Sequence, residues 1–129
     1  PSHVIWEGNT MYLNDASVRQ ILTDLSRVIE SCSASFDFFT ESVIDNTTGD
    51  PEITDVVARF AAMGAPWTYG IDNLSELAAQ CRATVVDRLT VADLHRAFWP
   101  DQPLASPLYG YYSLCTVQNA AAMSRAPRT

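Results

Sequence analysis

Residues 5–13 read Ile-Trp-Glu-Gly-Asn-Thr-Met-Tyr-Leu, and this stretch decides how the rest of the chain is interpreted. It begins as a short apolar strand, expected over residues 3–7, and Glu7 and Gly8 stand where that strand should end. Asn14 then offers an N-cap for a long amphipathic helix. Open α/β sheets place ligand contacts at the carboxyl ends of buried strands, so a carboxylate beside a glycine at this point predicts a binding site.

The rest of the chain alternates between helix and strand signals. Apolar residues at helical spacing predict a helix over about 15–31, and aromatic, β-prone residues predict a strand over 34–40. Asp50 followed by Pro51 starts a further helix, which Gly64 should end. The remaining expected elements are a loop over 65–71, a short helix from 72 or 73 to about 81, a strand over 83–89, a short helix over 91–99, a Pro-rich loop over 101–107 and a strand over 108–118.

This order of elements predicts an α/β fold with a layered sheet. The first two connections should be crossovers between parallel strands, whereas the short link before the last strand allows an antiparallel placement. A chain of 129 residues should form one domain around one core. We expect that domain to span residues 1–119, and we expect 120–129 to form a flexible tail.

Composition and charge exclude several classes of protein. A net charge of −7 argues against a general nucleic-acid binder, which needs clustered Lys and Arg to neutralise phosphates. No apolar run approaches the roughly 20 residues of a membrane span, and residues 1–30 lack the layout of a signal peptide. We therefore expect no nucleic-acid or membrane partner and a cytoplasmic location.

Cysteine and histidine positions suggest neither a disulfide framework nor a metal centre. Cys32, Cys81 and Cys115 are odd in number, widely spaced and set among apolar residues, so we expect reduced, packed thiols. His3 and His95 are far apart, and neither has another ligand at metal-binding spacing. No Gly-x-Ser-x-Gly motif suggests hydrolase chemistry.

Three motifs, in order and at sensible spacing, resemble the leucine-carboxyl-methyltransferase-like family, whose members use S-adenosylmethionine. Residues 6–13 resemble its WEG-x-TMYL signature, residues 35–39 (Ser-Phe-Asp-Phe-Phe) resemble its next strand, and residues 64–71 resemble its G-x-P-W-x-F/Y-G segment. The resemblance implies a three-layer, Rossmann-like class I methyltransferase. The chain would hold strands four to seven of its sheet, in the order 4-5-7-6 with the last strand antiparallel.

The elements that hold most of the cofactor in such enzymes are missing from this sequence. They are a Gly-rich turn after strand one and an acidic residue after strand two. The five glycines here are isolated and form no G-x-G, so the first of these elements has no counterpart. We therefore expect the C-terminal half of a longer methyltransferase, inactive as an isolated chain.

The resemblance also points to particular site residues. It implies that Glu7, with Gly8 beside it, contacts S-adenosylmethionine near its amino-acid end, where a carboxylate can accept hydrogen bonds from an ammonium group. Without the family, the sequence favours a strand-end Glu7 that faces solvent or bonds backbone N–H groups. The catalytic residue stays unknown. The substrate-side candidates are Tyr12, Asp37, Trp67 and Tyr69.

Each substrate-side candidate also has a purely structural interpretation. Tyr12 could contact the substrate or pack beneath the first helix. Asp37 should face away from its neighbours Phe36 and Phe38, where it could orient a substrate or bind backbone donors. Trp67 and Tyr69 could cover the substrate or anchor the core.

The function expected is methyl transfer to an oxygen nucleophile, a carboxylate on a small molecule or a protein. A carboxylate needs no deprotonation at neutral pH, which agrees with the lack of an obvious general base. Two other classes remain open: a non-catalytic assembly module derived from half of a methyltransferase, and a flavodoxin-like regulatory domain. We also expect self-association, most simply as a dimer, because the first strand would present an unpaired edge.

Overall fold

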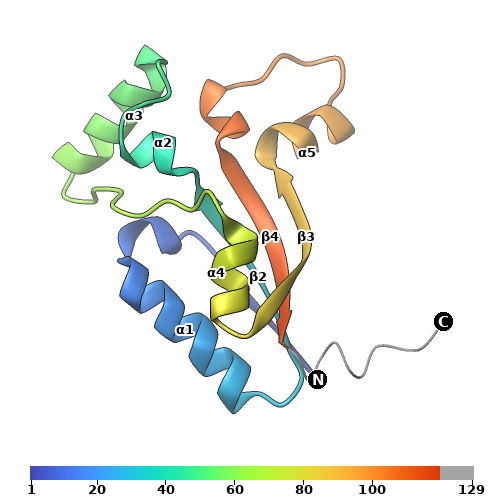
Figure 1. The fold of residues 1–129 in the computed structure, drawn as a ribbon. Helices are drawn as coiled ribbons and strands as arrows, with labels where there is room; N and C mark the ends of the chain where they lie inside the picture. The colour runs from blue at the N-terminus through green and yellow to red at the C-terminus, as the bar shows by residue number, and fades with distance from the viewer. Residues whose placement is uncertain (120–129) are drawn as a thin grey trace.

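The computed structural model describes residues 1–119; the expected flexible tail, 120–129, lies outside the described residues. Figure 1 shows the elements in chain order. They are β1 (Ser2–Trp6), η1 (Thr10–Tyr12), α1 (Asp15–Val28), β2 (Cys32–Phe39), α2 (Glu41–Ile44), α3 (Pro51–Ala62), α4 (Leu74–Gln80), β3 (Ala83–Thr90), α5 (Val91–Phe98), η2 (Pro107–Gly110) and β4 (Tyr112–Asn119).

The strands form one mixed sheet in the order β1-β2-β4-β3. β1 pairs with β2 in parallel, and β4 runs antiparallel to both β2 and β3. The α/β class expected from the sequence is therefore confirmed. Because β1 and β2 are parallel neighbours, their carboxyl ends meet at the same edge of the sheet.

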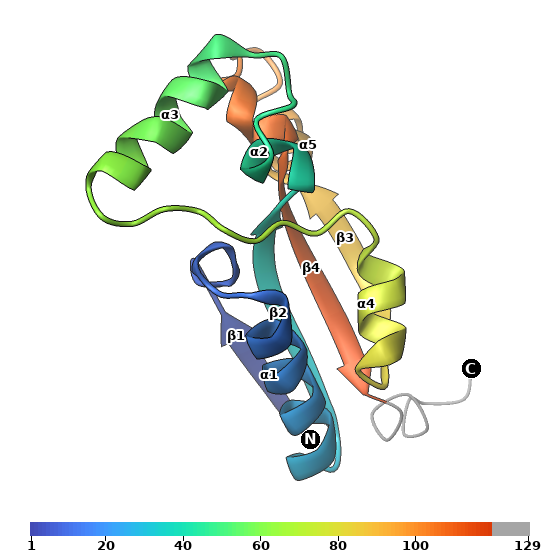
Figure 2. The same cartoon turned by 60° about the vertical axis from the view of Figure 1, so that its left-hand side comes forward.

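The helices cover only one face of this sheet. Figure 2 shows α1 and α4 on the same side, while α2, α3 and α5 gather beyond the end of the sheet where β1 and β2 finish. The expectation of three layers is thus wrong for residues 1–119, which form two. The physical reason is that α2 and α3 pack at the end of the sheet, where they build a second apolar cluster with η1 and η2, and α5 lies at that end as well. The other face of the sheet is therefore left open.

The main core lies between the covered face and helices α1 and α4. Phe36 and Phe38 of β2 point toward the helices, where Val18 and Leu22 of α1 meet them. Local signals start the helices as expected. The Asn14 side chain accepts the Ser17 N–H at 2.8 Å, and equivalent caps stand before α3 and α4. Thr90 and Asp93 form a capping box at the start of α5.

Some boundaries differ from the sequence expectation. The first helix ends at Val28 rather than near residue 31. The last strand begins at Tyr112 rather than residue 108, because Pro107 starts a 3-10 turn that Ser106 caps. The four-residue helix α2 was not predicted, since so short a segment shows no helical periodicity.

The cysteines are packed as expected. All three are free and buried. Burial raises the pKa of the Cys115 thiol to about 12, which keeps it protonated and unreactive at neutral pH. Within residues 1–119, no helix combines the length and apolar character that crossing a membrane requires.

Candidate functional site

The turn after β1 is bonded to the side chain of Asp37 in β2. The register pairs Trp6 with Phe36, so Glu7 and Gly8 leave β1 beside Asp37. The Gly8 N–H donates to Asp37 Oδ1 at 2.8 Å. Gly8 has φ +66°, a left-handed conformation that glycine adopts at little cost. Two parallel strand ends therefore bring together three of the residues expected at the site.

Asp37 is a buried carboxyl with a perturbed pKa. It is 2 % exposed and points away from Phe36 and Phe38, as the alternation of the strand predicts. Burial raises its pKa, the bond from the Gly8 N–H opposes that rise, and the charge of Glu7 adds to it. Such a shift beside a chain turn is a mark of functional sites, although structural networks also produce it.

Thr10 helps to hold the Glu7–Gly8 turn against β2. Its Oγ1 is buried and donates to the Asp37 carbonyl oxygen at 2.7 Å. Trp6 Nε1 donates to Asn9 Oδ1 at 2.9 Å and closes the turn on its other side. Sequence reasoning did not single out Thr10, although it stands within the WEG-x-TMYL match. The turn is therefore held by side chains on both flanks, which pre-orders the Glu7–Gly8 backbone.

The turn borders a hollow on the open face of the sheet, of about 360 Å³, which we call the acidic hollow. It carries three carboxylates and no Lys, Arg or His side chain among the residues that line it. Its lining residues are Ile5, Trp6, Glu7, Ser35, Phe36, Asp37, Asp87, Leu89, Leu114, Cys115 and Thr116. Unbalanced negative charge on a partly apolar surface favours a cationic ligand.

Glu7 is one of two exposed carboxylates in the acidic hollow. It is exposed, and no side chain or backbone group in residues 1–119 forms a hydrogen bond or ion pair with it. Asp87 is also exposed and reaches the hollow from β3, because a bulge between Val85 and Asp87 shifts its register with β4. Sequence reasoning missed Asp87, since its position depends on pairing between β3 and β4.

A second cavity, of about 340 Å³, has Gly8 in its lining, and we call it the aromatic pocket. Its lining residues are Gly8, Met11, Tyr12, Phe39, Val56, Phe60, Trp67, Leu108, Tyr109 and Tyr112. The Trp67 ring stacks on Phe39 with centroids 4.4 Å apart and lies 4.7 Å from Phe60. Trp67 Nε1 donates to the Tyr12 hydroxyl at 3.3 Å. The two residues of the turn thus belong to different cavities: Glu7 lines the acidic hollow and Gly8 lines the aromatic pocket.

The loop over 65–71 holds Trp67 in that pocket. The Thr68 N–H donates to the Met11 carbonyl at 2.7 Å, and the Ile71 N–H donates to the Phe39 carbonyl at 2.9 Å. Gly70 passes so close to β2 that a Cβ there would lie 2.7 Å from the Thr40 carbonyl oxygen. The loop is therefore bonded to the ends of both η1 and β2.

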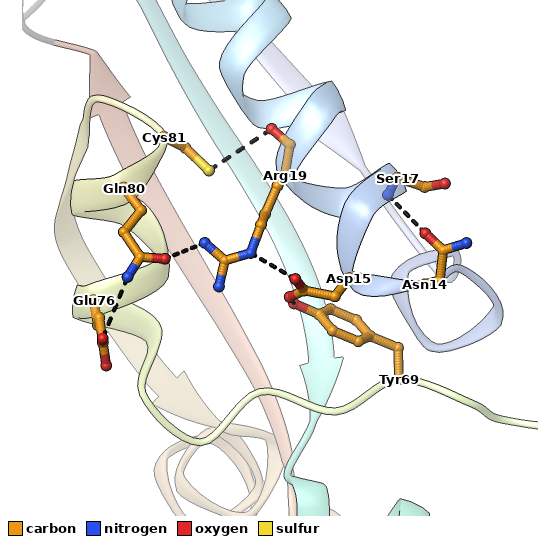
Figure 3. Close-up of polar contacts among 8 residues, drawn as sticks. All are labelled: Asn14, Asp15, Ser17, Arg19, Tyr69, Glu76, Gln80 and Cys81. Atoms are coloured by element: carbon orange, nitrogen blue, oxygen red, sulfur yellow. Dashed lines mark hydrogen bonds and ion pairs between the residues drawn. The ribbon is translucent and has the colours of Figure 1, made fainter.

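Tyr69 points to Asp15 at the start of α1 (Figure 3). Its hydroxyl donates to Asp15 Oδ1 at 2.9 Å, and Arg19 Nε donates to the other oxygen of Asp15 at 2.7 Å. Arg19 also donates to Gln80 on α4. Burial raises the pKa of Tyr69. This network ties the loop to the helices and does not bring Tyr69 to the Glu7–Gly8 turn.

The structure therefore groups Glu7, Gly8 and Asp37 around one turn and places Tyr12 and Trp67 in the adjoining pocket. In the part of the chain that is described, no group of three His, Cys, Asp or Glu side chains could hold a metal ion. Compared with known proteins, the sequence matches no protein-family model and no curated protein.

Proposed function

We propose that this chain is the C-terminal half of an S-adenosylmethionine-dependent O-methyltransferase of the leucine-carboxyl-methyltransferase-like type. The observation that carries the proposal is the Glu7–Gly8 turn, bonded to Asp37 at the carboxyl ends of two parallel strands. This is the position at which open α/β sheets bind ligands. The motifs of the resemblance fall on it: the signature contributes the turn, and the second motif contributes Asp37.

The sheet supports the same proposal. Strands four to seven of a class I methyltransferase are expected in the order 4-5-7-6 with strand seven antiparallel. The order β1-β2-β4-β3, with β4 antiparallel to its neighbours, corresponds to that arrangement strand by strand. In this correspondence the open edge of β1 is the side on which the first three strands would continue the sheet.

The residues around the turn fit the charged end of S-adenosylmethionine. That cofactor carries positive charge on its ammonium and sulfonium groups, and the acidic hollow offers carboxylates without a competing cation. Glu7 would accept hydrogen bonds from the ammonium group, and Gly8 would let the backbone approach closely. When bound, the cofactor supplies an activated methyl group.

The chemistry left to this chain is positioning. The cofactor would supply the methyl group and the acceptor oxygen would take it, so this chain would have only to bring the two together. A carboxylate acceptor is already ionised at neutral pH, so no general base is required. The aligned turn would contribute by holding donor and acceptor in line. The acceptor proposed here is a carboxylate on a small molecule or a protein.

The test compares variants of the complete protein, meaning this chain together with the preceding half that the proposal requires. Glu7→Gln keeps the size of the side chain but loses a charge-assisted hydrogen bond, worth roughly 1.5–3 kcal/mol. We expect its dissociation constant for S-adenosylmethionine to rise about 10- to 100-fold. Tyr12→Phe should raise it less, and the exposed Glu52→Gln should leave it unchanged. Equal dissociation constants for wild type and Glu7→Gln would remove Glu7 from the site.

A second candidate, a non-catalytic assembly module, is favoured by a separate observation. Ile5 in β1 is 74 % exposed on the open face, and β1 pairs with a single strand in residues 1–119. Such an edge suits pairing with another chain. Cofactor binding by the complete protein discriminates the two, since a module of this kind needs none.

A further inference from the structure

The aromatic pocket has a composition that selects its ligand. None of its ten lining residues is Asp, Glu, Lys, Arg or His, and six of them are aromatic. We infer that this pocket binds the apolar body of the methyl acceptor, and that the acceptor is a small aromatic carboxylic acid rather than a polypeptide. This inference rests on the proposed methyl transfer and adds the substrate class.

The size and walls of the pocket fit such a molecule. A cavity of about 340 Å³ lies at the small end of ligand sites, which run from about 300 to 1,000 Å³. Phe39 lies between Trp67 and Tyr112, with centroid separations of 4.4 and 4.6 Å. These separations belong to the stacking range of about 4.5–7 Å or just below it, so a flat ring can extend the array.

The Tyr12 hydroxyl, held in place by Trp67, can orient the ligand. The Tyr12 hydroxyl accepts a hydrogen bond from Trp67 Nε1 and donates to no protein group within residues 1–119. Its proton can therefore point to an oxygen of the ligand. Tyr12 lines the pocket together with Gly8, which directly follows Glu7 of the acidic hollow, so the pocket reaches the Glu7–Gly8 turn. That is where the donor methyl group is proposed to lie.

The same walls are unsuited to a peptide. Each peptide unit brings an N–H and a C=O that need partners once they leave water. The side chains of the pocket offer three tyrosine hydroxyls and one indole N–H, and the indole N–H is already bonded to Tyr12. A rigid aromatic acid buries the same apolar surface and leaves only its carboxylate to be satisfied.

Binding can be tested on the 129-residue chain without any cofactor, because every lining residue belongs to it. The probes are 2-naphthoate, its saturated analogue decahydro-2-naphthoate, and acetate. Equilibrium dialysis gives the dissociation constants, and NMR of the indole N–H signals reports the location. We expect 2-naphthoate to shift the signal of Trp67 and to spare Trp6 and Trp99. The saturated analogue should bind about 2- to 10-fold more weakly for lack of ring stacking, and acetate should not bind.

Variants at Val56 and Tyr12 locate the two ends of the ligand. Val56→Glu places a carboxylate in the pocket wall and should weaken 2-naphthoate binding by at least roughly 10-fold. Val28→Glu, the same change at an exposed site on α1, is its matched control and should bind like wild type. Tyr12→Phe should weaken binding about 10-fold, and Tyr111→Phe, outside the pocket, should not. If Val56→Glu does not fold, Val56→Thr is the second variant. It keeps the shape of the valine side chain but puts a hydroxyl in the pocket wall, so it should still weaken binding of 2-naphthoate.

The outcomes separate this inference from the proposed function. Absence of 2-naphthoate binding, a shift of Trp99 instead of Trp67, or equal affinity in wild type and the Val56 variants overturns the inference. Methyl transfer by the complete protein to another acceptor would then leave the proposed function standing. Binding in the pocket combined with no methyl ester of 2-naphthoate, in a complete protein that binds S-adenosylmethionine, overturns the assignment of the pocket to the acceptor.

Discussion

The same strands make both faces of the sheet, but helices bury one face and leave the other exposed. On the face toward α1 and α4, Phe38 is fully buried and Phe36 nearly so. On the other face, Ile5 is 74 % exposed and Leu114 is 36 % exposed. Because side chains alternate along a strand, each apolar neighbour in β1, β2 and β4 is directed to one face or the other.

The difference shows which face of the sheet is buried by the chain itself. The covered face is closed by helices within the chain and forms the core that holds the strands together. Between its apolar residues the open face carries short polar side chains, and Ser35 shares hydrogen bonds with His3 at 3.1 Å and Thr116 at 2.7 Å. The Glu7–Gly8 turn borders this open face, because Glu7 lines the acidic hollow and Gly8 bonds Asp37.

The largest expected effect is the difference in stability between matched leucine substitutions on the two faces of the sheet. Leu74→Ala removes a side chain that is 1 % exposed beneath the covered face, and we expect a loss of about 2–5 kcal/mol in the free energy of unfolding. Leu114→Ala, on the open face, should cost less than about 1 kcal/mol. Urea unfolding of both variants measures the difference. Similar losses at the two sites would mean that the open face is buried in the molecule in solution.

A charge placed in β1 tests whether the open edge of the sheet pairs with another chain. If the exposed β1 edge drives self-association of the 129-residue chain, Ile5→Lys should shift its light-scattering mass toward the monomer, because lysine opposes edge pairing. Val28→Lys, equally exposed but on α1, should not change the mass. A wild-type chain that stays monomeric at high micromolar concentration, with Ile5→Lys changing nothing, would contradict this role of β1.

The smallest effect is the pH dependence due to Asp37. Burial raises its pKa above the usual 3.8, so the folded state holds the proton more tightly than the unfolded chain does. Its contribution to stability is therefore present at acid pH and is lost as the pH rises from about 3.8 through the raised pKa. Asp37→Asn should flatten the fall in the free energy of unfolding over that window. The exposed Asp87→Asn serves as the control, and an unchanged slope in Asp37→Asn would contradict the shift.

Local signals predicted much of this fold. Caps at Asn14, Asp50 and Asn73 start helices through bonds between near neighbours, and the alternation of residues in β2 correctly turned Asp37 away from Phe36. Such features depend on a few consecutive residues, so they can be read from sequence.

Other features depend on partners distant in the sequence. The bond between Gly8 and Asp37 spans 29 residues, and Asp87 reaches the acidic hollow only through the bulged pairing of β3 with β4. The aromatic pocket takes Val56 from α3 and Leu108 from η2, which periodicity cannot bring together. Nothing in the sequence separated Tyr69 from Trp67, because both lie in the same loop. In the structure Trp67 lines the aromatic pocket, whereas the Tyr69 hydroxyl bonds Asp15.

The central claim is that the Glu7–Gly8 turn is one part of a cofactor site whose other part lies in the preceding half of the domain. Equilibrium dialysis of S-adenosylmethionine against the 129-residue chain and against the complete protein tests it most directly. We predict binding by the complete protein and weak or no binding by the chain, because no Gly-rich turn or ribose carboxylate stands in this sequence. Equal affinity in the two, or no binding by the complete protein, would contradict the account.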